Sequence, residues 1–306
     1  MVDLTARLSG LTLKNPVIGA SGCFGFGREF NEWYDIGRLG GIAVKGLTLK
    51  PSPGNPLPRI AETAAGMLNS IGLQNPGVDA FISEELPWLR GRDLAVIANI
   101  NGHSVKEFAL ITEKLNGVEG VHALEVNISC PNVEHGGMFF GTDPQMAAEV
   151  VRSVRCETRL PLIVKLTPNV TDITEIARAA EAEGADIISL INTVAGMAID
   201  IKKRRPVLPR GVGGLSGPAV KPVALRMVWE TAGAVSVPVI GMGGITDHRD
   251  ALEFLMAGAA AVAVGTGNFR DPMTGIRIVD GLTEWMEEEG VHELAQVIGA
   301  ARFCPA

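Results

Sequence analysis

Short apolar runs rich in Val, Ile and Ala recur along the chain. Each run is continuous rather than alternating, which is typical of strands covered on both faces of a parallel sheet. We expect eight such strands, at residues 16–20, 41–46, 94–99, 123–129, 161–167, 186–192, 237–241 and 261–265.

Segments with helical spacing lie between most of these strands. Ser104 is placed to cap one of them, and Asp143, followed by Pro144 at the first helical position, is placed to cap another. A third can begin at Thr171 or Asp172, and a fourth at Thr246. The expected helical segments are 104–117, 143–158, 171–184 and 246–258.

Eight strands alternating with helices in 306 residues predict an α/β fold, a TIM (β/α)8 barrel in one domain over residues 1–306. A doubly wound open sheet is the alternative. The connections 47–77 and 193–217 exceed plain turns, so we interpret them as inserted binding loops at the C-terminal face. Residues 4–8 and 11–14 are expected to form an N-terminal β-hairpin that closes the bottom of the barrel.

Composition narrows the function classes. The net charge of −7, without a basic stripe, argues against nucleic-acid binding. The basic run at 202–205 is expected to solvate a loop, with anion binding as the alternative. The four cysteines lie far apart, which argues against a zinc or iron–sulfur site in this chain, and no metal is expected. Without a signal peptide or an apolar run of about 20 residues, we expect a cytoplasmic protein that does not span a membrane.

Polar residues gather at the predicted carboxyl ends of the strands, where TIM barrels carry their chemistry. The side chains in question are those of Ser21, Lys45, Asn99, Asn127, Lys165, Asn192 and Thr193. Two lysines and three asparagines at matching positions are hard to attribute to packing, because buried Lys and Asn need partners.

Two glycine turns follow the last two strands. "GMGGITD" contains Gly243 and Gly244, and "VGTGNF" contains Gly265 and Thr266. Loops at these positions of a TIM barrel often expose backbone N–H groups to a phosphate. The pair therefore indicates a phosphorylated ligand, although glycines can also serve tight turns alone.

The lysines leave three interpretations open. A lysine beside a flavin stabilises the anionic reduced ring. A strand lysine can instead form a Schiff base. Either lysine can also be paired structurally with a strand carboxylate such as Glu125.

A thiol sits beside these groups. Cys130 directly follows the fourth predicted strand in a glycine-rich loop, and a thiolate there can act as a general base or a nucleophile. Cys23 is a rival in a similar loop, whereas Cys156 and Cys304 are interpreted as structural. His135 lies in the Cys130 loop and is a second acid/base candidate, although a loop or interchain contact is the preferred interpretation.

Six motifs in order resemble the dihydroorotate dehydrogenase family. They are "GLTLKP", "NSIGLQNPG", "NISCPN" with "HGGMFFG", "INTVAGMAID", "GGLSGPAVKP" and "GMGGI". The second and third have the form typical of class 1B catalytic subunits. The resemblance implies FMN-dependent oxidation of (S)-dihydroorotate to orotate in pyrimidine biosynthesis.

The resemblance also implies roles for residues. Cys130 would be the base that takes the proton from C5 while hydride leaves C6 for flavin N5. Flavin contacts would come from Ser21, Lys45, Gly46, Asn99, Asn127, Lys165, Ile191, Gly217, Gly243, Gly244, Gly265 and Thr266. Substrate contacts would come from Lys45, Asn69, Ser70, Ile71, Gly72, Leu73, Asn127, Asn192 and Thr193.

The same resemblance implies a partner. Electrons would reach NAD through a subunit carrying FAD and a [2Fe-2S] cluster, in a heterotetramer of two copies of each chain, with this chain forming a homodimer. The alternatives are a class 1A homodimer that reduces fumarate, a tRNA dihydrouridine synthase, and a non-catalytic phosphate-binding scaffold.

Overall fold

The structure is a computed structural model that describes residues 2–129 and 137–303. Eight parallel strands close into a barrel in the order β10-β15-β16-β3-β4-β7-β8-β9. Their bounds are β3 Val17–Gly19, β4 Gly41–Ala43, β7 Ala95–Ile100, β8 Ala123–Asn127, β9 Leu162–Lys165, β10 Ile187–Leu190, β15 Val239–Met242 and β16 Ala261–Val264.

Because the sheet closes on itself, the predicted TIM barrel is confirmed and the alternative, a doubly wound open sheet, is excluded. The last strand pairs with the first, with Val262 opposite Val17. All eight predicted strands are present, but most are shorter than predicted. At several carboxyl ends the chain leaves the sheet early, so that residues such as Ser129 and Thr167 follow their strands. That the whole chain forms one domain stays a prediction.

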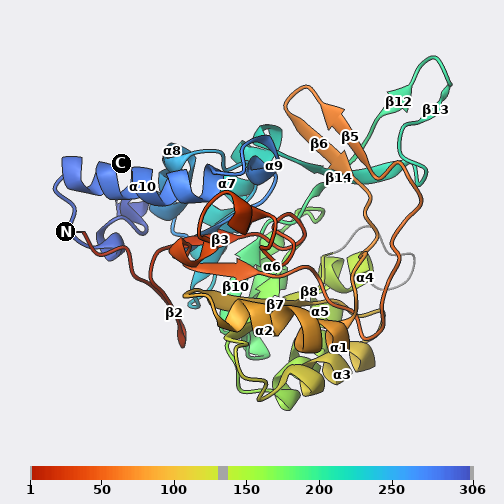
Figure 1. Ribbon diagram of the computed structural model, residues 1–306, viewed down its shortest axis with the longest axis horizontal. Helices are drawn as coiled ribbons and strands as arrows, with labels where there is room; N and C mark the ends of the chain where they lie inside the picture. Colours follow the sequence, from red (N-terminus) through yellow and green to blue (C-terminus); the bar gives the residue numbers. More distant parts are fainter. Residues whose placement is uncertain (1, 130–136, 304–306) are drawn as a thin grey trace.

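Helices surround the barrel (Figure 1). The α-helices are α1 Val78–Ala80, α2 Leu86–Arg90, α3 Val105–Leu115, α4 Gly137–Thr142, α5 Pro144–Glu157, α6 Ile173–Ala182, α7 Lys221–Ala232, α8 His248–Met256, α9 Gly267–Arg270 and α10 Thr274–Glu288. A π-helical segment, η3 Phe81–Glu85, joins α1 to α2. The short 3-10 helices are η1 Phe30–Glu32, η2 Ile36–Arg38, η4 Pro218–Val220, η5 Leu294–Gln296 and η6 Ala300–Phe303.

Three of the four predicted helix starts are confirmed by their capping bonds. The Ser104 hydroxyl accepts from the Glu107 amide, and the Asp143 carboxylate accepts from the Gln145 and Met146 amides. Of the two candidates for the third helix, Asp172 is the cap. The fourth cap is Asp247 rather than Thr246. Such caps satisfy N–H groups that the helix itself leaves without partners.

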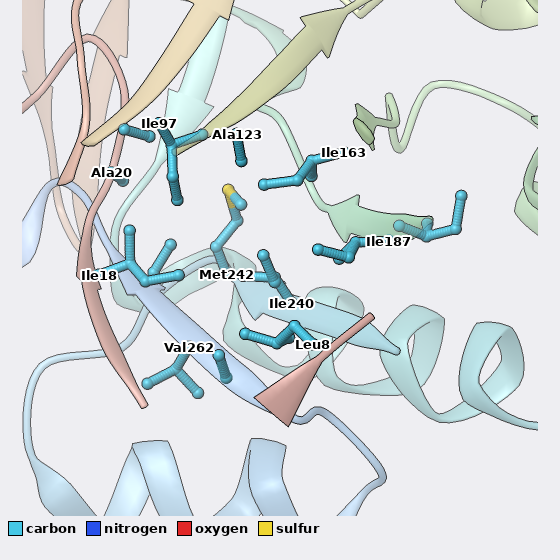
Figure 2. Close-up of a cluster of buried hydrophobic side chains, with 14 of the residues drawn as sticks. Leu8, Ile18, Ala20, Ile97, Ala123, Ile163, Ile187, Ile240, Met242 and Val262 are labelled. Atoms are coloured by element: carbon cyan, nitrogen blue, oxygen red, sulfur yellow. The ribbon is translucent and has the colours of Figure 1, made fainter. Parts of the chain in front are cut away.

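Branched apolar side chains fill the barrel interior (Figure 2). Ile18, Ile163 and Ile187 come from different strands and are at most 1% exposed. The predicted N-terminal hairpin is present as β1 Ala6–Leu8 and β2 Leu11–Leu13. Its Leu8 is fully buried and lies among the barrel side chains near Ile240, which confirms that the hairpin covers one end of the barrel.

The two long connections are more regular than predicted. Their strands β5 Ile60–Thr63, β6 Gly66–Asn69, β11 Val194–Met197 and β14 Val212–Ser216 form one sheet in the order β11-β14-β6-β5. The connections meet where β14 pairs antiparallel with β6. A second pair, β12 Ile199–Asp200 and β13 Arg205–Pro206, extends beyond this sheet at the upper right of Figure 1. Glycine allows the close pairing, since a Cβ at Gly66 would lie 2.0 Å from the Ser216 carbonyl oxygen.

No helix in the described part of the chain is both long and apolar enough to cross a membrane.

Candidate functional site

A cavity of about 610 Å³ opens where the carboxyl ends of the barrel strands meet the four-stranded sheet. That volume lies within the usual range for small-molecule and cofactor sites, about 300–1,000 Å³. The predicted site residues that line it are Ser21, Lys45, Gly46, Asn69, Ile71, Gly72, Leu73, Asn99, Asn127, Lys165, Ile191, Asn192, Thr193, Gly217, Gly243, Gly244, Gly265 and Thr266.

Two predicted residues are not among them. Ser70 is 1% exposed and does not line the cavity; its hydroxyl accepts a hydrogen bond from Asn55 Nδ2 at 3.0 Å. A direct side-chain contact from Ser70 to a ligand is therefore not supported, because alternate side chains of an extended segment point to opposite sides. Cys130, the predicted base, lies outside the described residues, as do His135 and Cys304.

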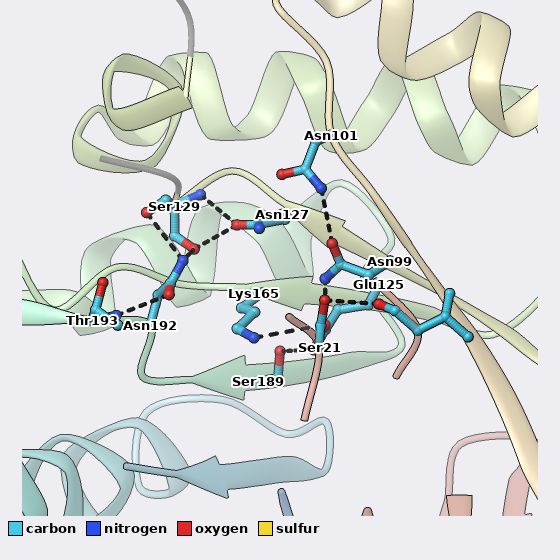
Figure 3. Close-up of polar contacts among 11 residues, drawn as sticks. Ser21, Asn99, Asn101, Glu125, Asn127, Ser129, Lys165, Ser189, Asn192 and Thr193 are labelled. Carbon is cyan, nitrogen blue, oxygen red and sulfur yellow. Dashed lines mark hydrogen bonds and ion pairs between the residues drawn. The ribbon is translucent and has the colours of Figure 1, made fainter. Parts of the chain in front are cut away.

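A buried polar network lies at the strand ends (Figure 3). Glu125 on β8 accepts from Asn99 Nδ2 at 2.5 Å and from the Ser189 hydroxyl at 2.9 Å. Asn99 Oδ1 in turn accepts from Asn101 Nδ2 at 2.9 Å. The Lys165 Nζ lies 3.9 Å from Glu125 Oε2. The structural pairing of Lys165 with Glu125 is therefore present, and Lys165 also lines the cavity.

A second network orients the asparagines on the other side of Lys165 (Figure 3). Asn192 Nδ2 donates to the Ser129 hydroxyl at 2.8 Å, and that hydroxyl donates to Asn127 Oδ1 at 2.8 Å. Asn192 Oδ1 accepts from the Thr193 amide. With Oδ1 of Asn127 directed at Ser129, its NH2 group lies on the opposite side of the amide, where it can donate to a planar ligand.

Three glycines from two turns come together at one side of the cavity. Gly217, Gly243 and Gly244 have φ values of +100°, +126° and +81°. A Cβ at Gly244 would lie 2.9 Å from the Gly217 carbonyl oxygen and 2.8 Å from Lys221 Cβ. Nearby, Thr266 Oγ1 donates to the Ser216 hydroxyl at 2.7 Å. This backbone-lined cradle leaves no room for side chains and suits an anionic group bound by N–H donors.

A cluster of charged side chains lies next to the Gly243–Gly244 turn, where Lys221 is close to Gly244. Lys221 Nζ donates to Asp250 at 2.6 Å and to Glu253 at 2.9 Å, and Asp250 also accepts from the Thr246 amide and hydroxyl. Burial acts to raise the pKa of Asp250, but the hydrogen bonds from Lys221 and Thr246 outweigh it and lower that pKa. The bond to Asp250 raises the pKa of Lys221.

Asp250→Asn is expected to weaken the acid dependence of stability. A carboxylate whose folded pKa is depressed adds stability that is present above its unfolded pKa, about 3.9, and is lost as pH falls through the folded value. Thermal unfolding measured between pH 7 and pH 3 should therefore show a smaller loss of Tm in the variant. Asp93→Asn is the control, since the Asp93 side chain is 97% exposed. Equal acid profiles for Asp250→Asn and wild type would contradict the prediction.

The described thiols are poor candidates for the base. Cys23 lines the cavity, but burial raises the pKa of its thiol against the opposing charges of Lys165 and Lys45. A raised pKa leaves little thiolate at neutral pH. Cys156 is exposed on α5 and does not line the cavity, so it is not placed to act in the site. Within residues 2–129 and 137–303, no group of three or more His, Cys, Asp or Glu side chains is arranged to hold a metal ion.

The basic run at 202–205 is exposed around the β12–β13 turn, as expected for a solvated loop, and does not line the cavity. Sequence reasoning missed several residues that do line it. Glu62, Met67 and Leu215 come from the four-stranded sheet, and Phe269 follows β16. Ser216 also lies there, and its place inside the "GGLSGPAVKP" motif could have identified it.

A comparison with known protein families identifies the family of this chain. The family described as "Dihydroorotate dehydrogenase" matches residues 3–286. The chain belongs to the dihydroorotate dehydrogenase family. This confirms the resemblance found in the motifs, and the family implies a flavin cofactor.

Relatives in this dihydroorotate dehydrogenase family match along nearly their whole length. Three of them carry the name "Dihydroorotate dehydrogenase B (NAD(+)), catalytic subunit". The Geotalea daltonii protein is 54% identical over 98% of this chain and 99% of its own length. The Geotalea uraniireducens protein is 55% identical over 97% and 98%, and the Alkaliphilus oremlandii protein 54% over 97% and 98%. Their name implies that each works with a further subunit.

Proposed function

We infer that this chain is the catalytic subunit of an NAD-linked dihydroorotate dehydrogenase, which oxidises dihydroorotate to orotate in pyrimidine biosynthesis. One observation carries the inference. The near-full-length match to catalytic subunits of that name coincides with a cavity lined by all but one of the residues predicted to contact flavin and substrate, Ser70 being the exception.

The proposed flavin is FMN, and the residues fit it. The cradle at Gly217, Gly243 and Gly244 suits a phosphate, because three glycines with positive φ line the cavity there and present backbone rather than side chains to a ligand. Lys165 places a positive charge at the same mouth, where it favours a reduced ring with negative charge. When bound, FMN supplies the acceptor for the hydride that leaves C6 of the substrate.

The substrate is held by amides and a lysine. Dihydroorotate offers a carboxylate, ring carbonyls and ring N–H groups, and an Asn side chain can both donate and accept. Asn127 and Asn192 line the cavity together with Asn69 and the segment from Ile71 to Leu73, and Lys45 suits the carboxylate. We propose Cys130 as the base that takes the C5 proton, a step made easier when a hydrogen bond to the adjacent carbonyl polarises it.

We further propose the partner that the family implies. A subunit with FAD and a [2Fe-2S] cluster would pass electrons to NAD, in a heterotetramer of two plus two in which two copies of this chain form a dimer. The name of the relatives, which pairs "catalytic subunit" with NAD, supports a partner. A cytoplasmic location stays a prediction.

Absorbance of the purified protein tests this function. We expect a yellow protein that releases FMN on denaturation and that bleaches anaerobically on titration with dihydroorotate. NAD should restore the colour only when the partner subunit is added. A colourless protein that fails to bind added FMN would contradict the proposal, and reoxidation of the isolated chain by fumarate would contradict the NAD-linked part of it.

A further inference from the structure

Glu125 is a buried carboxylate that the proposed function does not yet use. It is 3% exposed, sits on β8 between Asn99 and Lys165, and does not itself line the cavity. Both of its oxygens accept hydrogen bonds, one from Asn99 and one from Ser189. These bonds hold the carboxylate in place from two directions, because Asn99 lies on β7, next to β8, and Ser189 lies on β10, two strands away in the same closed barrel.

The Glu125 carboxylate forms a buried ion pair with Lys165. Lys165 Nζ lies 3.9 Å from Glu125 Oε2, and the side chains are only 6% and 4% exposed. A buried charge is costly unless it is compensated, and interactions at such sites are screened far less than at the surface. The carboxylate therefore offsets part of the positive charge that Lys165 directs at the cavity.

We propose that Glu125 is a positioning residue that sets the reduction potential of the bound flavin through Lys165. The proposal rests on the proposed function. Two-electron reduction adds negative charge to the flavin, so the nearby lysine favours the reduced form and the buried carboxylate opposes it. Asn99, held by the same carboxylate, lines the cavity beside Lys165, so both side chains take their position from Glu125.

The test compares the flavin reduction potential of FMN-loaded wild type with those of two single variants, each lacking one charge, and of the double variant, which lacks both. The variants are Glu125→Gln, Lys165→Met and the double variant, and the potential is measured by equilibration with a reference redox dye. Glu125→Gln is expected to shift the oxidised–reduced equilibrium about tenfold towards reduced flavin, which is about 30 mV for a two-electron couple. Lys165→Met should shift it the opposite way. The double variant, in which no charge remains on either side chain, should return towards wild type.

Ser189→Ala is the matched control. It removes one hydrogen bond to Glu125 but no charge, so it should leave the potential within a factor of two of the wild-type equilibrium. A purely structural role for Glu125 would lower the melting temperature in Glu125→Gln without moving the potential, and that result would overturn the inference.

Two further comparisons distinguish failure of this inference from misfolding of a variant and from failure of the proposed function. If Glu125→Gln does not fold, the double variant is compared with Lys165→Met, and equal potentials for these two would overturn the inference. If wild-type protein binds no FMN, the proposed function fails first. If wild type binds FMN and bleaches with dihydroorotate but the potentials of all variants coincide, only the role of Glu125 is lost.

Discussion

Cys130→Ala is expected to retain bound FMN while the rate of flavin reduction by dihydroorotate falls about 10²–10⁴-fold. That range is what general acid–base catalysis commonly contributes. The flavin remains because its expected contacts come from other residues, all of which line one cavity. Anaerobic stopped-flow absorbance, which follows the bleaching step alone, measures the effect separately from transfer to NAD.

Cys23→Ala is the matched control for this experiment. Cys23 lines the same cavity, but burial raises the pKa of its thiol, so it should hold its proton at neutral pH. Its replacement should change the reduction rate by less than about tenfold, on the scale of a minor packing change. Cys130→Ser should lie between wild type and Cys130→Ala, since a hydroxyl is a weak base unless activated. A normal rate in Cys130→Ala, or a larger loss in Cys23→Ala, would remove Cys130 as the base.

Gly244→Ala is expected to lower the affinity for FMN at least about 100-fold, equivalent to about 2.7 kcal/mol or more. The added Cβ would lie 2.9 Å from both the Gly217 carbonyl oxygen and the Lys221 amide nitrogen, so backbone atoms must shift. The backbone at Gly244, with φ +81°, is also unfavourable for alanine. Both effects distort the cradle proposed for the phosphate. Fluorescence titration of FMN with apoprotein measures the affinity.

Gly117→Ala is the control that separates the effect of the close Cβ contact from the effect of a positive φ. Gly117 has a similar φ of +72°, but a Cβ there would meet nothing within 4 Å, and it follows α3 away from the cavity. This control should cost about 1–2 kcal/mol of folding stability and leave FMN affinity unchanged. If Gly244→Ala bound FMN as tightly as wild type, the glycine cradle would not be the phosphate site.

Much of the site could be predicted because a parallel barrel places strand ends together. Once the eight apolar runs were recognised, Lys45, Asn127 and Lys165 were expected at the same mouth, since each ends or follows a strand. The roles assigned to them came from the motif resemblance. A motif gives a position in the chain but not the direction of a side chain, and the Ser70 hydroxyl bonds to Asn55 rather than lining the cavity.

The sequence by itself determined the barrel, its helix caps and the residues that follow each strand. These features depend on local pattern, since apolar continuity makes a strand and a capping side chain satisfies a helix end within a few residues. It also carried the motifs that identify the family.

Only the tertiary structure decided how the two long connections pair and what Glu125 contacts. The β6–β14 pairing joins segments far apart in the chain, and it forms only when barrel closure brings them over the same mouth. Likewise Glu125 meets Asn99, Lys165 and Ser189 because neighbouring strands fix their register. A buried charge depends on its neighbours in space, and no local pattern of residues specifies them.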